Sequence, residues 1–188
     1  GESVVSEFLW STGRSRIDYV VATHADADHV QGLEDVVNNF DVGTAIFGRA
    51  SPTDTELAGL FNALLRRDLP IERLSRGDSF NVGDVRVEIL SPIGAEVAGR
   101  ASDNDQSLVM RLVYGEQSFL LTGDIEAGAE RRMLASGTIS STVVKVPHHG
   151  SKTSSTAEFV AAANARYSVV SAGRRSQFSH PHKEVVDR

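Results

Sequence analysis

Residues 17–29 read I-D-Y-V-V-A-T-H-A-D-A-D-H and join an apolar run to a dense group of possible metal ligands. Residues 17–23 predict a buried strand, because the run is apolar and rich in β-branched residues. A helix is predicted directly afterwards, so the ligand-rich motif lies at a strand-to-helix junction. The apolar residues at helical spacing are Val30, Leu33, Val36, Val37 and Phe40.

All six histidines of the chain fall in three close pairs, each beyond a β-rich apolar run. A structural histidine needs one or two hydrogen-bond partners, whereas a metal site gathers several nitrogen and oxygen ligands from separate strand ends. The pairing therefore favours a metal site over ordinary core or surface histidines. The pairs are His24 with His29, His148 with His149, and His180 with His182.

The composition is that of an ordinary soluble globular domain, with 188 residues, 40% hydrophobic and 23% charged. No run approaches the roughly 20 apolar residues that cross a bilayer, and the first residues form no signal-peptide pattern. The chain has no cysteine, so metal ligands must come from His, Asp, Glu and Asn. The formal charge of −6 argues against a generally basic surface that coats nucleic acid.

Strands and helices alternate along the rest of the chain, which predicts one α/β domain over residues 1–188 with helices covering both faces of a sheet sandwich. A capping-box spacing from Ser155 to Glu158 opens one helix, and Pro181 is expected as the first residue of another. Further strands are predicted at 44–47, 71–74, 78–82, 85–89, 107–114, 117–122, 142–146 and 167–172, and further helices begin near Thr53 or Asp54, near Ala127 and at 155.

The first motif can supply two adjacent metal sites, because alternation projects His24 and Asp26 to one side and Asp28 and His29 to another. Asp124 follows the strand at 117–122, and its two oxygens could bridge two ions. Two ordinary alternatives stay open: Asp28 with His29 could cap a helix, and Asp124 could belong to a simple Gly-Asp turn. Ser107 and Asn104 are weaker candidates.

Four motifs together resemble the metallo-β-lactamase fold, in particular the ComEC-type branch of competence and DNA-internalisation proteins. They are H-A-D-A-D-H, L-L-T-G-D at 120–124, V-P-H-H-G-S-K-T-S at 146–154 and S-A-G-(x)6-H-P-H at 171–182. The resemblance implies a four-layer αββα sandwich with a dinuclear metal site at one edge. Such domains usually begin with a further hairpin and continue with further strands, so the chain is expected to be a partial domain lacking its first and last strands.

The resemblance also implies the roles of individual residues. His149 is favoured only slightly over His148 as a ligand, Asp28 or Asp124 would orient a hydroxide, and His182 would contact substrate or assist the leaving group. A surface histidine at a helix end is an equally good interpretation of His182. The implied metal ligands are His24, Asp26, Asp28, His29, Asp124, His148, His149 and His180.

Two departures from the family pattern bear on the metal. Asp26 stands where a histidine is usual, and residues 103–107, D-N-D-Q-S, stand where the third-motif histidine is usual. An oxygen-rich ligand set shifts the preference toward Mn²⁺ or Mg²⁺, although Zn²⁺ remains compatible. Two divalent ions, Mn²⁺ or Zn²⁺, are therefore the expected cofactors, and such a pair suits hydrolysis of a phosphodiester.

By resemblance, the expected function is a nuclease or phosphodiesterase that degrades the strand of DNA that is not imported, with single-stranded DNA as substrate. The same resemblance implies a membrane channel domain in the parent protein and a location outside the bacterial cytoplasmic membrane. A hydrolase of a small ester, phosphoester or lactam and a non-catalytic, metal-stabilised module are the alternatives. The basic residues that could meet a phosphate backbone, or simply be solvated charges, are Lys145, Lys152, Arg174, Arg175 and Lys183.

Overall fold

The computed structural model describes residues 1–48, 54–93, 102–135, 137–173 and 178–188, and the chain divides into two compact units. Unit 1 is Gly1–Leu74 and unit 2 is Ser75–Arg188. The expectation of one domain over the whole chain stays a prediction. Among the described residues, no helix is both long enough and apolar enough to cross a bilayer.

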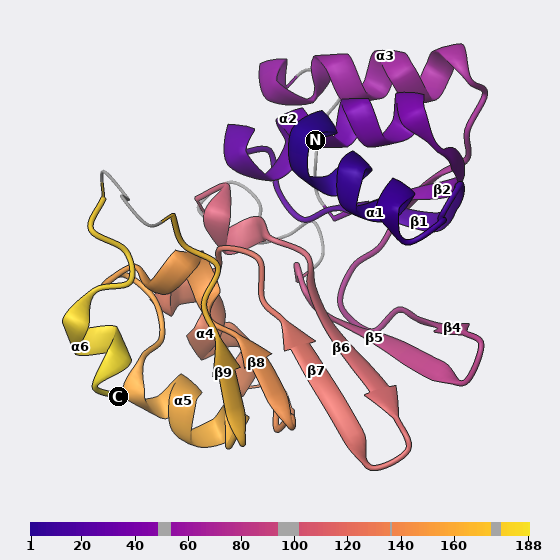
Figure 1. Cartoon of the computed structure of the whole chain (residues 1–188). Coiled ribbons are helices and arrows are strands. Elements are labelled where there is room, and N and C mark those ends of the chain that lie inside the picture. The colour runs from indigo at the N-terminus through magenta and orange to yellow at the C-terminus, as the bar shows by residue number, and fades with distance from the viewer. Residues whose placement is uncertain (49–53, 94–101, 136, 174–177) are drawn as a thin grey trace. The chain divides into compact units, whose positions relative to one another are not determined.

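Unit 1 is a three-stranded parallel sheet with helical crossovers, in the order β1-β2-β3 (Figure 1). Parallel neighbours need a crossover connection, which α2 supplies between β1 and β2 and α3 between β2 and β3. The strands are β1 (Arg16–Ala22), β2 (Asp41–Phe47) and β3 (Ile71–Arg73), and the helices are η1 (Glu2–Ser6), α1 (Glu7–Ser11), α2 (Ala27–Asn39), η2 (Thr55–Leu57) and α3 (Ala58–Arg66).

The core of unit 1 fixes both ends of the first ligand motif. Val20 and Ala22 of β1 are buried, whereas Tyr19, directly before Val20, is exposed. Successive side chains of a strand point to opposite faces, so this alternation is expected. Phe47 of β2 stacks on Phe61 of α3 with ring centroids 4.9 Å apart. Because β1 and α2 are both anchored in this core, the loop that joins them has little freedom.

Unit 2 is a six-stranded mixed sheet in the order β4-β5-β6-β7-β8-β9. The first four strands pair antiparallel, and β7, β8 and β9 pair parallel, so the carboxyl ends of these last three strands lie at one edge. The strands are β4 (Ser79–Val82), β5 (Val85–Ser91), β6 (Val109–Tyr114), β7 (Gln117–Leu121), β8 (Val143–Lys145) and β9 (Tyr167–Val169). The helices are η4 (Asn104–Gln106), α4 (Ala127–Leu134), η5 (Pro147–Gly150), α5 (Ala157–Ala163) and α6 (Lys183–Val186).

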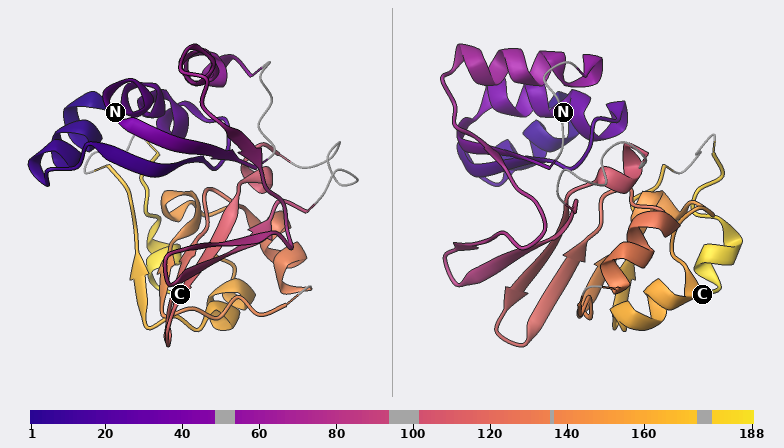
Figure 2. Two further views of the ribbon diagram at one scale, coloured as in Figure 1. Left: turned by 90° about the vertical axis from the view of Figure 1, so that its right-hand side faces the viewer. Right: turned by 180° about the vertical axis from the view of Figure 1, so that it is seen from behind.

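A single apolar cluster joins α4 and α5 to the sheet of unit 2. Leu120 of β7 and Val144 of β8 are buried in it with Met133 of α4 and Phe159 of α5. The two helices lie against the same face of that sheet (Figure 2). This packing holds the segments that leave β7 and β8, on which the second group of predicted ligands lies.

The predicted element types are confirmed, but several boundaries were wrong. Thr156, not Ser155, caps α5, because its hydroxyl accepts the N–H of Phe159 at 3.3 Å. The backbone N–H groups of Ser155 and Thr156 instead donate to the buried carboxylate of Glu130. The last helix begins at Lys183 rather than at Pro181, with His182 as its N-cap.

Candidate metal centre

In unit 1 the first motif begins α2. Asp26 is the N-cap of this helix: its carbonyl oxygen accepts the N–H groups of His29 and Val30 at 2.9 and 3.1 Å. Its side chain makes no capping hydrogen bond among the described residues. Asp28 and His29 therefore lie in the first turn and are not the cap, and the Asp26 carboxylate is not used by the helix end.

The four predicted ligands of this motif lie together. The His24 and His29 rings have centroids 4.2 Å apart. Nε2 of His24 lies 3.6 Å from Oδ2 of Asp26, and Nε2 of His29 lies 3.7 Å from Oδ2 of Asp28. His24 is buried, while both carboxylates are half-exposed or more. Two imidazole–carboxylate pairs thus lie in the six residues that lead into and begin α2.

In unit 2, Asp124 lies three residues beyond β7 and is buried. Its backbone N–H donates to Oγ of Ser107 at 3.1 Å, so Ser107 positions Asp124. Oδ2 of Asp124 lies 3.1 Å from Nε2 of His149, and Oδ1 lies 3.4 Å from Nζ of Lys145. Asn104 begins the short helix η4, as a turn residue would.

The His148-His149 segment has an unusual backbone. Both residues are left-handed, with φ of 48° and 53°, a conformation that costs about 1–3 kcal/mol per non-glycine residue. Gly150 follows at φ 83°, and a Cβ there would lie 2.5 Å from Cβ of Pro181. This close approach brings the third histidine pair against the second, and the backbone N–H of His182 donates to the Gly150 carbonyl at 2.9 Å.

Four histidine rings consequently gather in unit 2. His180 lies between the others, with ring centroids 5.7 Å from His148, 6.4 Å from His149 and 5.2 Å from His182. Burial, followed by the repulsion of His148, His182 and His149, lowers the pKa of His180. Its neutral form, which a metal ligand requires, is therefore favoured.

Nδ1 of three imidazoles, two in unit 2 and one in unit 1, lies close to a protein oxygen. Nδ1 of His149 lies 2.6 Å from the Ser171 carbonyl oxygen, and Nδ1 of His24 lies 3.0 Å from Oγ1 of Thr23. Nδ1 of His148 lies 3.4 Å from Oε1 of Glu126. Metal-binding histidines are commonly held in this way, with one ring nitrogen on a protein oxygen and the other left for the ion.

The residues present fit a divalent metal. A carbonyl oxygen can only accept, so Nδ1 of His149 carries a proton, and in the neutral ring Nε2 presents a lone pair to Asp124. At 3.1 Å, Nε2 and Oδ2 are close enough to share a cation, either a proton or a metal ion. Two ligands at about 2.0 Å from one tetrahedral ion are about 3.3 Å apart, close to this spacing.

The sequence did not indicate Glu126 as a site residue, and it did not indicate the position that Lys145 takes. Glu126 accepts the hydroxyl of Thr153 at 2.9 Å and lies beside His148, and its backbone N–H donates to Asp105 at 3.0 Å. Its place two residues after Asp124, in G-D-I-E, was the only available signal. Lys145 was expected to face phosphate, but its ammonium group is directed at Asp124 and the Gly123 carbonyl.

The remaining basic residues do not form a described patch. Lys152 is exposed, and Lys183 is exposed and pairs with Asp187, the C-cap of α6. Arg174 and Arg175 lie outside the described residues. The described part of unit 2 therefore gives direct support to none of the predicted phosphate contacts.

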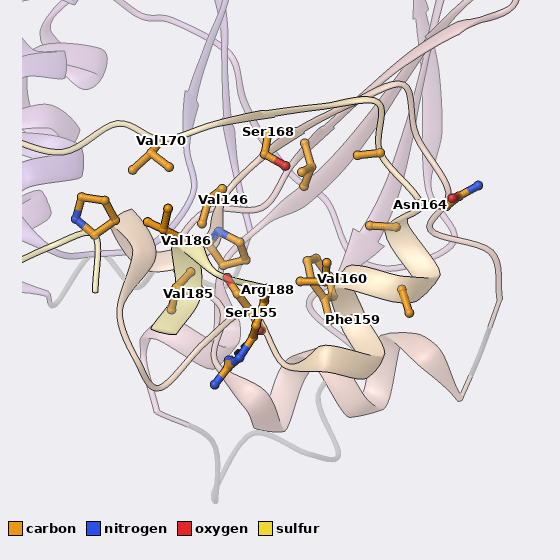
Figure 3. A pocket seen from close by; sticks show the side chains of 16 residues that line it. Val146, Ser155, Phe159, Val160, Asn164, Ser168, Val170, Val185, Val186 and Arg188 are labelled. Carbon is orange, nitrogen blue, oxygen red and sulfur yellow. Dashed lines mark hydrogen bonds between the residues drawn. The ribbon is translucent and has the colours of Figure 1, made fainter. Parts of the chain in front are cut away.

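A separate apolar cavity of about 430 Å³ lies in unit 2 among β8, α5 and α6 (Figure 3). Val146, Phe159, Val170 and Val185 line it, and Arg188 is the only ionisable side chain on its wall among the described residues. It lacks the convergent polar groups of a catalytic site. The chemistry of unit 2 therefore belongs to the histidine cluster.

Comparison with known proteins identifies the family to which the chain belongs. The sequence pattern of the Metallo-beta-lactamase superfamily matches residues 2–174, and the chain belongs to this superfamily. The predicted metallo-β-lactamase fold is confirmed, and members of the superfamily are usually metal-dependent hydrolases.

The chain is similar in sequence to competence proteins, which confirms the predicted ComEC-type resemblance. It is 32% identical over 187 residues to ComE operon protein 3 of Bacillus subtilis, covering 99% of this chain and 24% of that protein. It is 29% identical over 182 residues to competence protein ComA of Neisseria gonorrhoeae, covering 96% of this chain and 23% of that protein. The chain thus spans about a quarter of the length of these relatives.

Among solved structures, the chain resembles a diphosphatase from the PhnP family, with 16% identity and a TM-score of 0.49. The match covers 87% of this chain and 63% of the diphosphatase. It also resembles CmlA, a diiron β-hydroxylase from Streptomyces venezuelae, with 19% identity and a TM-score of 0.46, over 70% of this chain and 25% of that one.

Proposed function

We propose that the chain is a nuclease or phosphodiesterase domain that uses two divalent ions, Mn²⁺ or Zn²⁺, to cleave single-stranded DNA. The observation that carries the proposal is the pair formed by His149 and Asp124, in which an oriented imidazole nitrogen meets a buried carboxylate oxygen at 3.1 Å. Superfamily membership and the similarity to competence proteins support the proposed substrate class.

The proposed ligands belong to the four motifs that resemble those of the family. Carboxylates make up much of the set, which suits the harder ions that bind phosphate oxygens. When bound, the ions would lower the pKa of a water molecule and neutralise charge on the phosphate. The proposed ligands are His24, Asp26, Asp28, His29, Asp124, His148, His149 and His180.

The chain's own residues then have defined tasks. Asp28 or Asp124 would accept a hydrogen bond from the attacking water and so orient it toward phosphorus. His182, held to the Gly150 carbonyl by its backbone N–H, would donate a proton to the leaving oxygen. Ser107 would keep Asp124 in place through its hydrogen bond, and Glu126 would keep His148 in place through its contact with Nδ1 at 3.4 Å.

The biological setting follows from the same relatives. We propose that the domain belongs to a DNA-uptake protein, is joined there to a membrane channel domain, and acts outside the bacterial cytoplasmic membrane. The strand that is not imported would be its substrate. A small ester, phosphoester or lactam is the alternative substrate class, since a fold supports many chemistries.

A substrate panel tests the proposal. The purified chain is assayed with Mn²⁺ on labelled single-stranded DNA, bis-p-nitrophenyl phosphate, nitrocefin and a lactone. We expect DNA and the phosphodiester to be cleaved, chelator to stop cleavage, and Asp124→Asn to lose about 100-fold or more in rate. Asp84→Asn, in the exposed β4–β5 turn, is the matched control and keeps wild-type rates. Cleavage of nitrocefin or the lactone alone would contradict the proposal, and so would tight metal binding with no turnover of any substrate.

A further inference from the structure

The ammonium group of Lys145 contacts one oxygen of the buried Asp124 carboxylate, which also faces His149. Lys145 is the last residue of β8, and β8 lies parallel to β7, so its side chain reaches the segment that leaves β7. Nζ donates to the Gly123 carbonyl at 3.0 Å and to Oδ1 of Asp124 at 3.4 Å. The lysine side chain is 22% exposed and that of Asp124 is 4% exposed.

The backbone of Lys145 is fixed as well. Its carbonyl oxygen accepts the hydroxyl of Thr122 at 2.7 Å, so the ends of β7 and β8 are joined by a side-chain bond in addition to the ladder. The other oxygen of Asp124, Oδ2, lies 3.1 Å from His149. The two oxygens therefore have different neighbours: Oδ1 has the lysine ammonium group and Oδ2 has an imidazole nitrogen.

We propose that Lys145 is a resident cation of the metal centre: it holds Oδ1 of Asp124 so that this carboxylate offers only Oδ2 to metal. Lys145 is a positioning residue, because it acts through Asp124. This inference rests on the metal centre of the proposed function. The sequence suggested that Asp124 bridges two ions with its two oxygens, whereas here the ions would share Oδ2 alone.

Removal of the Lys145 charge should affect the stability of the metal-free protein and its affinity for metal in opposite directions. A buried carboxylate that loses its cation destabilises the metal-free protein. The same change removes a positive charge close to the incoming ion and frees a second oxygen, so the ion is held more tightly. If Lys145 only supported the local fold, its replacement would lower both the stability of the metal-free protein and its affinity for metal.

The test measures Mn²⁺ affinity by calorimetric titration and thermal unfolding with and without Mn²⁺. For Lys145→Met we expect a lower melting temperature without metal, Mn²⁺ binding tighter by roughly tenfold, and a larger stabilisation by Mn²⁺ than in the wild type. Lys145→Arg retains the charge and should bind Mn²⁺ close to the wild-type affinity. Lys152→Met, which removes an exposed lysine of the same unit, is the matched control and should change neither quantity.

The outcomes separate this inference from the proposed function. Mn²⁺ binding by the wild-type chain, with equal or weaker binding by Lys145→Met, would overturn the role of Lys145 alone. Absence of Mn²⁺ binding by the wild-type chain would overturn the metal centre and this inference with it. Lys145→Gln, which also removes the charge but stays polar, gives the same comparison if the methionine variant does not fold.

Discussion

Nε2 of His149 lies 3.1 Å from Oδ2 of Asp124, while Nδ1 of the same ring lies 2.6 Å from the Ser171 carbonyl oxygen. Because a carbonyl oxygen can only accept, it holds Nδ1 as the donor and leaves Nε2 facing a buried carboxylate. Nε2 and Oδ2 are therefore placed to share a cation, either a proton or a metal ion.

Replacing this imidazole should abolish tight metal binding in unit 2. For His149→Ala we expect the affinity for Mn²⁺ to fall by more than about 100-fold, because loss of a ligand must exceed the 10–100-fold loss typical of its supporting contacts. Calorimetric titration measures the change. Affinity within a few-fold of wild type would show that His149 is not a ligand.

Glu126 should act on metal binding through His148. Glu126→Gln weakens the hold on Nδ1 of His148, so Mn²⁺ affinity should fall by about 10–100-fold while the fold is kept. Glu116→Gln, in the exposed β6–β7 turn, provides the comparison and should bind like wild type. Equal affinities for the two variants would remove Glu126 from the site.

The sequence named candidate ligands in both halves of the site, but it could predict the local backbone only of the first half. Residues 17–29 combine strand periodicity with a ligand-rich helix start, and both features are local, so the position of the His24–His29 motif followed from pattern alone. The left-handed backbone at His148 has no local signal, because histidine does not demand positive φ. It depends on the tertiary contact between Gly150 and Pro181.

The sequence did not predict the contact of Lys145 with Asp124, for a related reason. Its proximity in sequence to His148 suggested a phosphate contact, but the pairing of β8 with β7 brings it to Asp124, 21 residues earlier in the chain. Strand pairing at that separation is decided by the whole sheet and not by the residues near the lysine. The same applies to Ser107, which reaches Asp124 across 17 residues.

Gly150 should be intolerant of any side chain. Gly150→Ala adds a Cβ 2.5 Å from Pro181 in a left-handed backbone, so the free energy of unfolding should fall by about 1–3 kcal/mol. Gly173→Ala meets nothing within 4 Å and should change it little. Urea denaturation compares the two; equal stability of both variants would contradict the packing of the His180–His182 segment on η5.

Glu130 should make stability depend on pH. Burial raises the pKa of this carboxyl, although the backbone N–H groups of Ser155 and Thr156 oppose the shift. The folded state therefore holds the proton to higher pH than the unfolded state does, and this stabilisation is lost as pH rises from the unfolded pKa through the raised folded pKa. Denaturation of the metal-free proteins across this pH range measures the free energy of unfolding. We expect the wild type to lose stability relative to Glu130→Gln as pH rises. If the free energies of the two proteins changed in parallel with pH, this prediction would be contradicted.

The central claim is that the histidines and aspartates hold divalent metal, and the bound metal can be counted directly. The chain is loaded with Mn²⁺, freed of excess by gel filtration and measured by elemental analysis. We predict two ions per wild-type chain, as expected for a dinuclear centre, and fewer in Asp124→Asn. No stoichiometric metal in the wild type, or an equal metal content in both proteins, would contradict the account.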